Sequence, residues 1–282
     1  MKLLRYGPPG QEKPALLDSS GALRDLSGHV RDIDGGTLRS ESLSRLREID
    51  PTDLPVVADD VRIGPPVADV GKFICVGLNY YDHAKESGMD VPAEPVLFMK
   101  ATSSISGPFD PVRLPRGSKK TDWEVELGVI IGDCASYVAE EDALRHVAGY
   151  CVVNDISERE YQLERGGQWV KGKSCDTFGP IGPWLVTADE VPDPQSLLLW
   201  LDLNGARTQD GNTRTMVFGV AKLVSYISQF MSLQPGDIIT TGTPPGVGLG
   251  MKPPRYLVDG DVMTLGIDGL GSQRQVVVRG SA

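Results

Sequence analysis

Two glutamates, Glu124 and Glu126, lie two residues apart at the start of an apolar run, 124–131. In a β-strand, successive side chains point to opposite faces, so both carboxylates share one face while Val125 and Leu127 share the other. A solvated acidic face on an edge strand is the ordinary explanation of such a pair. The alternative is a pair of carboxylates held side by side to bind a metal ion.

A third acid, Asp155, follows a second apolar run, 150–153. It directly precedes a predicted helix with the capping-box pattern Ser157-x-x-Glu160, so it could serve as an alternative N-cap. It could also supply a third metal ligand beside the two glutamates. Since no Cys or His stands at metal-ligand spacing, three carboxylates would form an oxygen-only site, which suits Mg²⁺ or Mn²⁺ rather than zinc.

One histidine, His83, has a carboxylate within reach, because Glu86 follows it by three residues on a predicted short helix, 80–87. A carboxylate beside an imidazole orients the ring and raises its basicity, as a general base requires. A surface or core histidine is an equally frequent explanation. His29 and His146 have no comparable neighbour and are assigned structural roles.

Asp155, Arg159 and Gln162 follow an i, i+4, i+7 spacing, which places them on one face of a predicted helix, 157–165. Arg159 could simply form an ion pair with Asp155 or Glu160. Its planar guanidinium could instead bind the carboxylate of a substrate. The sequence leaves both interpretations open.

Two further candidates lie in segments rich in Gly and Pro. Lys173 follows Gly172 in a predicted loop, where a lysine is usually solvated but could also supply positive charge to a developing enolate. Thr243 follows a predicted strand, 237–241. Its hydroxyl and the neighbouring backbone N–H groups could surround an oxyanion, and a plain turn is the alternative.

The elements that would position these residues are mostly short strands. Apolar runs of strand length, bounded by Gly, Pro or Asp, recur from residue 72 onward, and helices are few. The predicted strands of this region are 72–76, 96–99, 124–131, 150–153, 197–203, 237–241, 262–267 and 275–278, and the predicted helices are 80–87, 140–147, 157–165 and 220–231.

Residues 1–68 are predicted to form a small N-terminal α+β domain, and residues 69–282 the catalytic domain. The proline-bearing stretch 61–68 is the predicted linker, because paired prolines stiffen the chain. The N-terminal domain is expected to contain strands at 2–6, 15–17 and 23–26 and an amphipathic helix at 42–49.

The 282 residues include 33 Gly and 21 Pro, which excludes a coiled coil or helical bundle. A net charge of −10 with scattered basic residues argues against nucleic-acid binding. The four cysteines form no CxxC pair, which predicts buried free thiols and a reducing compartment. With no signal sequence and no apolar stretch of membrane-spanning length, we expect a cytoplasmic protein without membrane partners.

Taken together, the motifs resemble the fumarylacetoacetate hydrolase family over the main domain, from Lys72 to the C-terminus. The resemblance rests on five motifs in the family's order and spacing. They are Asn79-Tyr80-x-Asp82-His83-x-x-Glu86, Asp122-x-Glu124-x-Glu126-Leu127, Asn154-Asp155-x-Ser157-x-Arg159-x-x-Gln162, Lys171-Gly172-Lys173 with Gly179-Pro180 and Pro183-Trp184, and Gly236-Asp237 with Thr241-Gly242-Thr243-Pro244.

The resemblance implies an α+β, mainly β protein, with a mixed β-roll catalytic domain, a small N-terminal domain and a homodimeric assembly. It also implies one Mg²⁺ or Mn²⁺ per subunit and a small 2-oxo acid as substrate. By the same resemblance, the metal ligands are Glu124, Glu126 and Asp155, the catalytic residues are His83, Glu86 and Lys173, and the substrate-binding residues are Arg159, Gln162 and Thr243.

The full-length hydrolases that give the family its name carry a further carboxylate on the strand before the catalytic histidine, whereas the strand 72–76 has none. The chain therefore resembles the shorter three-carboxylate branch. Members of this branch hydrolyse a C–C bond in a 2,4-diketo acid, either an acylpyruvate or a 2,4-diketo-3-deoxy sugar acid, to pyruvate and a second acid. The stretches 245–257 and 270–275 look like those of the sugar-acid hydrolases. Relatives with the same motifs decarboxylate oxaloacetate, or isomerise and decarboxylate acids of the 2-hydroxyhepta-2,4-dienedioate type, and these reactions are the alternative.

Overall fold

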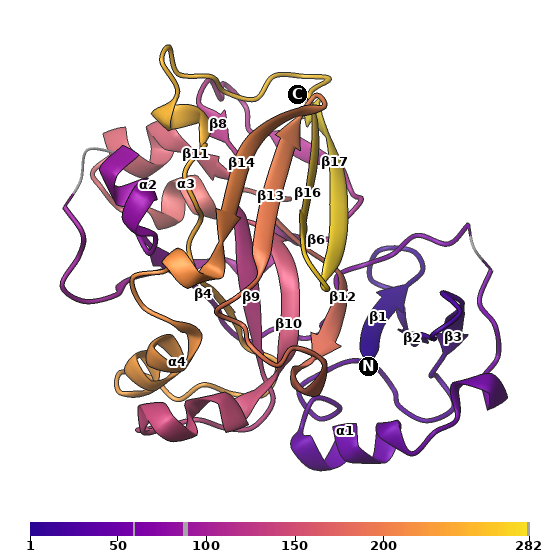
Figure 1. Cartoon of the computed structure of the whole chain (residues 1–282). Coiled ribbons are helices and arrows are strands. Elements are labelled where there is room, and N and C mark those ends of the chain that lie inside the picture. The colour runs from indigo at the N-terminus through magenta and orange to yellow at the C-terminus, as the bar shows by residue number, and fades with distance from the viewer. Residues whose placement is uncertain (59, 87–89, 281–282) are drawn as a thin grey trace.

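The fold is built around a ten-stranded mixed sheet (Figure 1). The structure, a computed structural model, describes residues 1–58, 60–86 and 90–280, with the side chains of residues 83–85 outside the described part. In sheet order, the strands are β3 (Leu23–Asp25), β2 (Lys13–Leu17), β1 (Lys2–Tyr6), β12 (Gly179–Thr187), β10 (Val147–Asn154), β9 (Val125–Ile131), β15 (Ile238–Thr240), β4 (Phe73–Gly77) and β5 (Val96–Lys100), and β6 (Ile105–Ser106) pairs with β12.

A second sheet of five strands packs against one face of the large sheet. Val125, Leu127 and Val129 of β9 belong to the same buried core as Leu201 and Leu265 of the second sheet. This alternation confirms the strand periodicity predicted for β9. The second sheet has the order β14 (Ala206–Asn212), β13 (Leu198–Leu203), β16 (Val262–Ile267), β17 (Gly271–Arg279) and β7 (Val112–Leu114), and a separate pair joins β8 (Thr121–Asp122) to β11 (Ser157–Glu158).

The opposite face of the large sheet packs against the N-terminal segment. Ile130 of β9 and Val153 of β10 share a core with Leu3 and Leu43. In addition, β1 pairs antiparallel with β12, so the N-terminal strands continue the large sheet. The predicted domain boundary after residue 68 stays a prediction.

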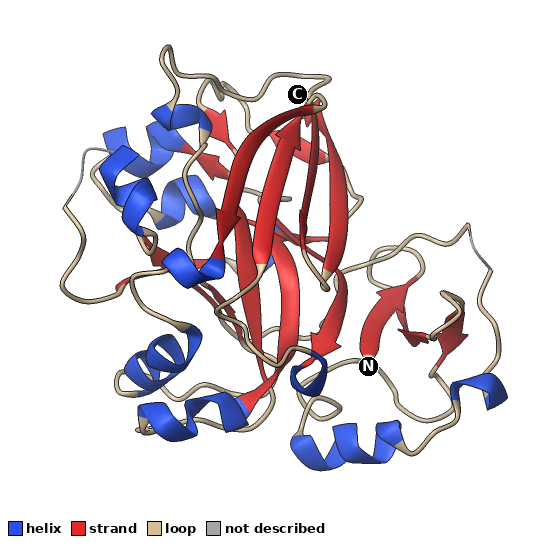
Figure 2. Ribbon diagram, in the orientation of Figure 1, coloured by secondary structure: helices blue, strands red, loops and turns tan. Residues whose placement is uncertain are grey.

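Helices lie at the periphery of the sheets (Figure 2). The α-helices are α1 (Ser40–Arg47), α2 (Tyr81–Glu86), α3 (Val170–Lys173) and α4 (Val220–Ser228). Short 3₁₀ turns span Pro51–Asp53, Thr102–Ser104, Glu140–His146, Ala188–Glu190, Thr213–Thr215 and Gly248–Gly250, and Glu160–Glu164 forms one π-helical turn.

The predicted helix 157–165 is wrong in its first half. Ser157 and Glu158 are extended and pair with β8 as β11. The Ser157 hydroxyl donates to the Asp155 carbonyl at 2.9 Å instead of capping a helix, and the buried Glu158 carboxylate accepts from the Thr121 hydroxyl at 3.0 Å. Pairing with a neighbouring strand therefore overrides the local helical spacing.

The Gly- and Pro-rich segment that contains and follows Lys173 is predicted as a loop, but from Gly179 onward it forms a strand, β12. Pro183 lies beside a register shift between β10 and β12, where the ladder is interrupted between Tyr150 and Val152. A proline is tolerated at such a bulge because no ladder hydrogen bond requires its missing N–H. Close contact between these strands also requires a glycine, since a Cβ at Gly149 would lie 2.2 Å from the Val186 carbonyl oxygen.

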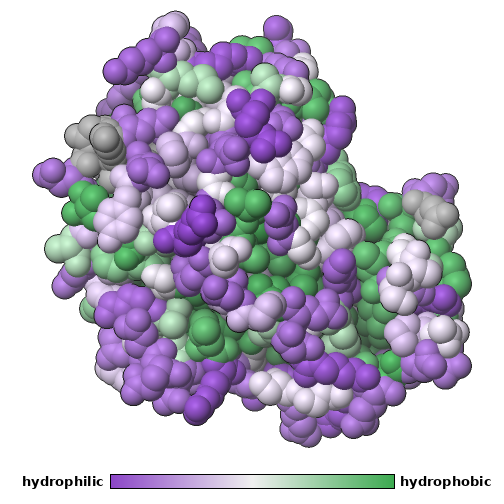
Figure 3. All heavy atoms as spheres, in the orientation of Figure 1, coloured by the Kyte–Doolittle hydropathy of each residue, from purple (hydrophilic) through white to green (hydrophobic). Residues whose placement is uncertain are grey.

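The surface and the cysteines add two findings. In Figure 3, hydrophobic residues gather where the N-terminal segment meets the main body. All four cysteines are free, and Cys75 and Cys151 are buried as predicted, whereas Cys134 is exposed and corrects the prediction of buried thiols. Within the described residues, no helix has the length and apolar character needed to cross a membrane.

Gly149→Ala is expected to lower the free energy of unfolding by about 2–3 kcal/mol, because the new methyl group forces β10 and β12 apart. Urea unfolding measures the change. The matched control is Gly28→Ala, since a Cβ at this exposed glycine meets no atom within 4 Å. Equal stability of the two variants would contradict the close approach of these strands.

Candidate active site

Three buried carboxylates meet at one end of the large sheet. Glu124 immediately precedes β9, Glu126 lies within it, and Asp155 follows β10. Glu126 faces Val153 across the two strands, and the Asp155 N–H donates to the Glu124 carbonyl at 2.9 Å. One ligand oxygen from each of the three side chains lies within 4.8 Å of the others. The structure thus brings the three predicted carboxylates together.

Two buried lysines contact these carboxylates. Lys173 Nζ lies 2.6 Å from Glu124 Oε2 and 2.7 Å from Asp155 Oδ2. Lys100 Nζ lies 2.5 Å from Asp155 Oδ1 and donates to the Ile156 carbonyl at 3.0 Å. Burial disfavours the charged form of Lys173, but the Asp155 and Glu124 carboxylates outweigh this effect and raise its pKa. Lys173 is therefore a cation at neutral pH.

The predicted loop at Lys173 is wrong, because this residue ends the short helix α3 and its side chain is 2% exposed. Gly172 permits the helix to pack closely, since a Cβ there would lie 2.4 Å from the Glu158 carbonyl oxygen. This close packing, together with the two carboxylates, directs the lysine inward. Glycine density alone had indicated a solvated loop.

Glu126 differs from the other two carboxylates in its partners. Its Oε2 accepts the Gly242 N–H at 2.8 Å. Burial raises the pKa of Glu126 well above its ordinary value, and the charges of Asp155 and Glu124 raise it further. A cation placed among the three carboxylates would favour the ionised form of all of them.

Asp122, at the end of β8, joins the cluster to a neighbouring loop. Its fully buried carboxylate accepts the N–H groups of Gly248 at 2.7 Å and Leu249 at 2.9 Å. Arg159 Nε donates to the same carboxylate at 2.9 Å. Arg159 Nη2 lies 2.8 Å from Asp122 Oδ2 and 2.7 Å from Glu124 Oε1. Asp122 therefore fixes both the guanidinium and the loop.

The three predicted substrate-binding residues line one pocket with Glu124 and Glu126. Arg159 Nη1 donates to Gln162 Oε1 at 3.1 Å across the π-helical turn. The predicted helical face with Asp155 does not exist, because the chain between Asp155 and Arg159 is extended. Of the alternatives that the sequence left open for Arg159, the ion pair with Asp155 or Glu160 gives way to pairs with Asp122 and Glu124.

The hydroxyl of Thr243 already has partners within the protein. It donates to the Val125 carbonyl at 2.9 Å and accepts from Gln209 Nε2 at 2.8 Å. These bonds fix the strand-to-loop turn, so the hydroxyl is oriented by the scaffold. A direct role of Thr243 toward an oxyanion stays a prediction.

Glu86 of α2 contacts the loop that follows Thr243. Its two carboxylate oxygens lie 3.1 and 3.2 Å from the donating Gly246 N–H. Gly250 lies so close that a Cβ there would be 2.6 Å from Glu86 Cδ. The backbone of His83 belongs to α2, but its side chain lies outside the described residues, so the predicted contact between His83 and Glu86 stays a prediction.

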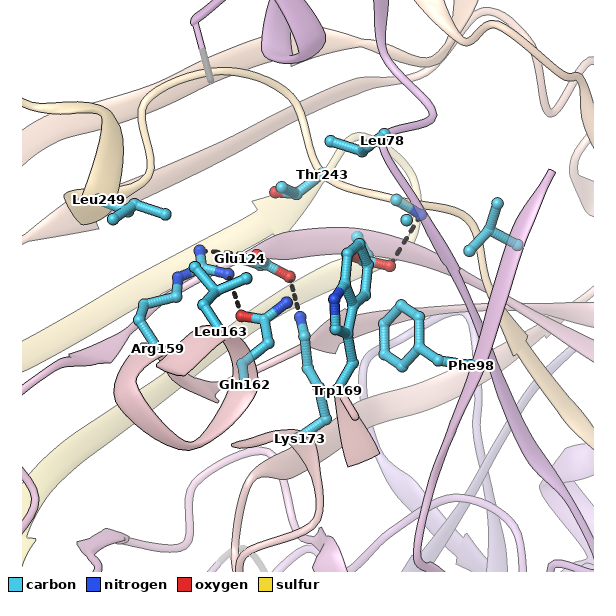
Figure 4. Close-up of a pocket in the computed structure, with 14 residues that line it drawn as sticks. Leu78, Phe98, Glu124, Arg159, Gln162, Leu163, Trp169, Lys173, Thr243 and Leu249 are labelled. Carbon is cyan, nitrogen blue, oxygen red and sulfur yellow. Dashed lines mark hydrogen bonds and ion pairs between the residues drawn. The ribbon is translucent and has the colours of Figure 1, made fainter. Parts of the chain in front are cut away.

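Aromatic and aliphatic side chains line the pocket beside the charged groups (Figure 4). Phe98 of β5 and Trp169 pack edge to face with ring centroids 5.3 Å apart. Lys173 Nζ lies 5.1 Å from the centroid of the Phe98 ring. Gly77 makes room for the indole, since a Cβ there would lie 2.4 Å from the Trp169 ring. The other apolar lining residues are Val76, Leu78, Leu163 and Leu249.

Sequence reasoning missed Lys100, Phe98 and Trp169. Lys100 directly follows the predicted strand 96–99, and a lysine at the end of a strand is normally solvated. Strand alternation could have placed Phe98 and Lys100 on one face. Nothing in the local sequence indicates that this face meets the carboxylates of β9 and β10.

The donor set fits a hard divalent cation. The group of possible ligands found among the described residues contains carboxylate oxygens and no Cys or His. Mg²⁺ and Mn²⁺ are bound by such oxygen ligands. Glu124, Glu126 and Asp155 are therefore the residues that would hold the ion.

A mainly β fold with a carboxylate site at the end of a mixed sheet defines the class of protein. The C-terminal domain of fumarylacetoacetate (FAA) hydrolase matches residues 72–278. The chain belongs to the fumarylacetoacetate hydrolase family, whose members are enzymes, and the family and fold class expected from the sequence are confirmed.

Relatives resemble the chain over almost its whole length. A protein from Burkholderia multivorans (strain ATCC 17616 / 249) with only a general hydrolase name is 65% identical over 277 residues, covering 98% of each chain. Fumarylacetoacetate hydrolase from Exiguobacterium antarcticum is 37% identical with a TM-score of 0.87, covering 99% of this chain and 100% of that one. Maleylpyruvate hydrolase from Sphingobium sp. SYK-6, in complex with manganese(II) and pyruvate, is 31% identical with a TM-score of 0.83, covering 100% of both chains.

Asp122→Asn is expected to lower the free energy of unfolding by about 3 kcal/mol, because it removes the charge that compensates the buried Arg159. Urea unfolding measures the loss. Asp268→Asn, at an exposed position, is the matched control and should change stability by less than about 0.5 kcal/mol. If Asp122→Asn were as stable as this control, Asp122 would not hold Arg159 and the loop.

Proposed function

We propose that the chain is an Mg²⁺- or Mn²⁺-dependent hydrolase, with one ion per subunit of a homodimer. It would cleave the C3–C4 bond of a 2,4-diketo acid, either an acylpyruvate or a 2,4-diketo-3-deoxy sugar acid, and release pyruvate and a second acid. The observation that supports this proposal most directly is the contact of the Lys173 ammonium with Glu124 and Asp155, two of the three clustered carboxylates.

When bound, the divalent ion supplies Lewis acidity toward the oxygens of a 2-oxo acid. Arg159 and Gln162 line the same pocket and offer N–H donors to the substrate carboxylate. Because Asp122 and Glu124 hold the guanidinium in place, its remaining donor is oriented before substrate arrives.

Lys173 is suited to stabilise the enolate that forms when the C–C bond breaks. An ammonium has three N–H donors, and carboxylates accept two of them. The third donor has no hydrogen-bond partner within the described part of the chain, so it can point toward substrate, and the raised pKa keeps the group charged. The electron pair of the C3–C4 bond then moves to C3, and protonation there gives pyruvate.

The hydrolytic water requires a base, and we propose His83 for this role. Its imidazole would take a proton from water as the oxygen adds to the C4 carbonyl. Glu86, whose carboxylate binds the Gly246 N–H, would orient this histidine and hold α2 near the loop.

Pyruvate release measured with and without Mn²⁺ tests the reaction. We expect metal-dependent release from an acylpyruvate or a 2,4-diketo-3-deoxy sugar acid, and loss of activity with EDTA. Oxaloacetate is included because an enolate also forms on decarboxylation. If only oxaloacetate is turned over, the protein is a decarboxylase and not a hydrolase. If none of these substrates is turned over, the isomerase becomes the favoured assignment.

The substitution Glu126→Gln tests the proposed metal site directly. The amide keeps the shape of the side chain but loses the charge, so Mn²⁺ affinity should fall at least tenfold. Mn²⁺ titration followed by electron paramagnetic resonance measures binding independently of turnover. Glu48→Gln, at an exposed glutamate, is the control and should bind like the unaltered protein.

His83→Ala is expected to lower kcat about 10²–10⁴-fold, since a general base contributes on this scale. Mn²⁺ affinity should stay unchanged, because His83 is not among the proposed ligands. His29→Ala, at an exposed histidine, is the control. Full turnover by His83→Ala would remove this residue from the mechanism.

A further inference from the structure

The pocket has two chemically distinct regions. Its floor is charged and contains Glu124, Glu126 and Lys173. Its wall is apolar. We call this region the apolar wall, formed by Leu78, Phe98, Leu163, Trp169 and Leu249.

The cations that line the floor are already paired with carboxylates. Arg159 contacts Asp122 and Glu124, and Lys173 contacts Glu124 and Asp155. Lys100 contacts Asp155 behind the floor. Among the described lining residues, the cation with a contact to the apolar wall is Lys173, whose Nζ lies 5.1 Å from the centroid of the Phe98 ring, and this ammonium is already paired with Glu124 and Asp155.

The charge of the cluster suits one carboxylate on the substrate. When all groups are ionised, the cluster contains four carboxylates and three cations, so its net charge is −1. Binding of a divalent cation changes this net charge to +1. The carboxylate of a 2-oxo acid neutralises this charge. A second carboxylate, on the acyl group, would be desolvated without a partner at considerable cost. The groups counted are Asp122, Glu124, Glu126, Asp155, Lys100, Arg159 and Lys173.

The apolar wall is partly exposed although its side chains are large. Phe98, Trp169, Leu78 and Leu249 are half-buried, and Leu163 is 44% exposed. Figure 4 shows Trp169 and Phe98 on one side of the floor and Leu249 on the other. Apolar side chains left open to solvent at a pocket gain free energy when a ligand covers them.

The Leu249 side chain can be replaced without loss of the hydrogen bond that holds this loop. Its backbone N–H donates to Asp122 at 2.9 Å, so the loop is held by the main chain rather than by the side chain. Leu249 is therefore placed as a specificity-determining position of the apolar wall.

We propose that the apolar wall binds the acyl group of the substrate, an inference that rests on the proposed function. The preferred substrates are then 2,4-diketo acids whose acyl group is uncharged and apolar, in preference to acyl groups that carry hydroxyls or a second carboxylate.

The test compares kcat/KM for acetylpyruvate, butanoylpyruvate, hexanoylpyruvate, succinylpyruvate and a 2,4-diketo-3-deoxy sugar acid, all with Mn²⁺. We expect kcat/KM to rise about threefold for each methylene between acetyl and hexanoyl. Succinylpyruvate and the sugar acid should be at least tenfold poorer than butanoylpyruvate.

Two substitutions at Leu249 locate the effect. Leu249→Ala should lower kcat/KM at least fivefold more for hexanoylpyruvate than for acetylpyruvate. Leu249→Lys should raise the ratio of kcat/KM for succinylpyruvate to that for butanoylpyruvate at least tenfold. Leu198→Ala removes an exposed leucine of β13, outside the pocket lining, and should leave the whole series unchanged.

The outcomes separate the two proposals. If no 2,4-diketo acid releases pyruvate, the proposed function fails and the inference with it. If succinylpyruvate or the sugar acid is preferred, or if the Leu249 variants keep the unaltered substrate profile, the inference is overturned while the hydrolase assignment stands.

Discussion

The site depends on the mutual compensation of buried charges. An ionised carboxylate removed from water is strongly disfavoured unless it is paired and hydrogen-bonded. Asp155 meets this requirement with two lysines, and Asp122 meets it with Arg159 and three backbone N–H groups. Glu126 instead has a backbone partner and a raised pKa. Added positive charge would therefore stabilise the cluster most at Glu126.

Carboxylates of the site and of α2 also shape the loop beside the pocket. Backbone N–H groups of Gly242, Gly246 and Gly248 donate in turn to Glu126, Glu86 and Asp122. Close packing requires glycine at two of these positions, because a Cβ at Gly246 or Gly248 would lie 1.9 Å from a backbone oxygen. The loop conformation is thus linked to the carboxylates that accept its N–H groups. A change to one of these carboxylates is therefore expected to change the conformation of the loop as well.

Strand periodicity predicted which carboxylates lie together. Alternation placed Glu124 and Glu126 on one face, and the end of the next apolar run placed Asp155 near them. The inward course of Lys173 and Lys100 was not predictable in this way, because each is directed by a carboxylate from another element. The strand β12 was missed for a related reason, since its Pro183 is accommodated by a bulge that exists only when β10 is paired. Contacts between distant elements decided each of these cases.

The division of the pocket into floor and wall separates two kinds of constraint. The carboxylates of the floor belong to or directly adjoin paired strands, where a one-residue shift would turn every side chain to the opposite face. In the apolar wall, Leu78 and Leu249 lie outside the strands, in segments that tolerate changes of side chain. The enolate chemistry that we propose therefore depends on sheet register. The acyl-group preference that we propose depends instead on side chains such as Leu249, whose backbone N–H is anchored through Asp122.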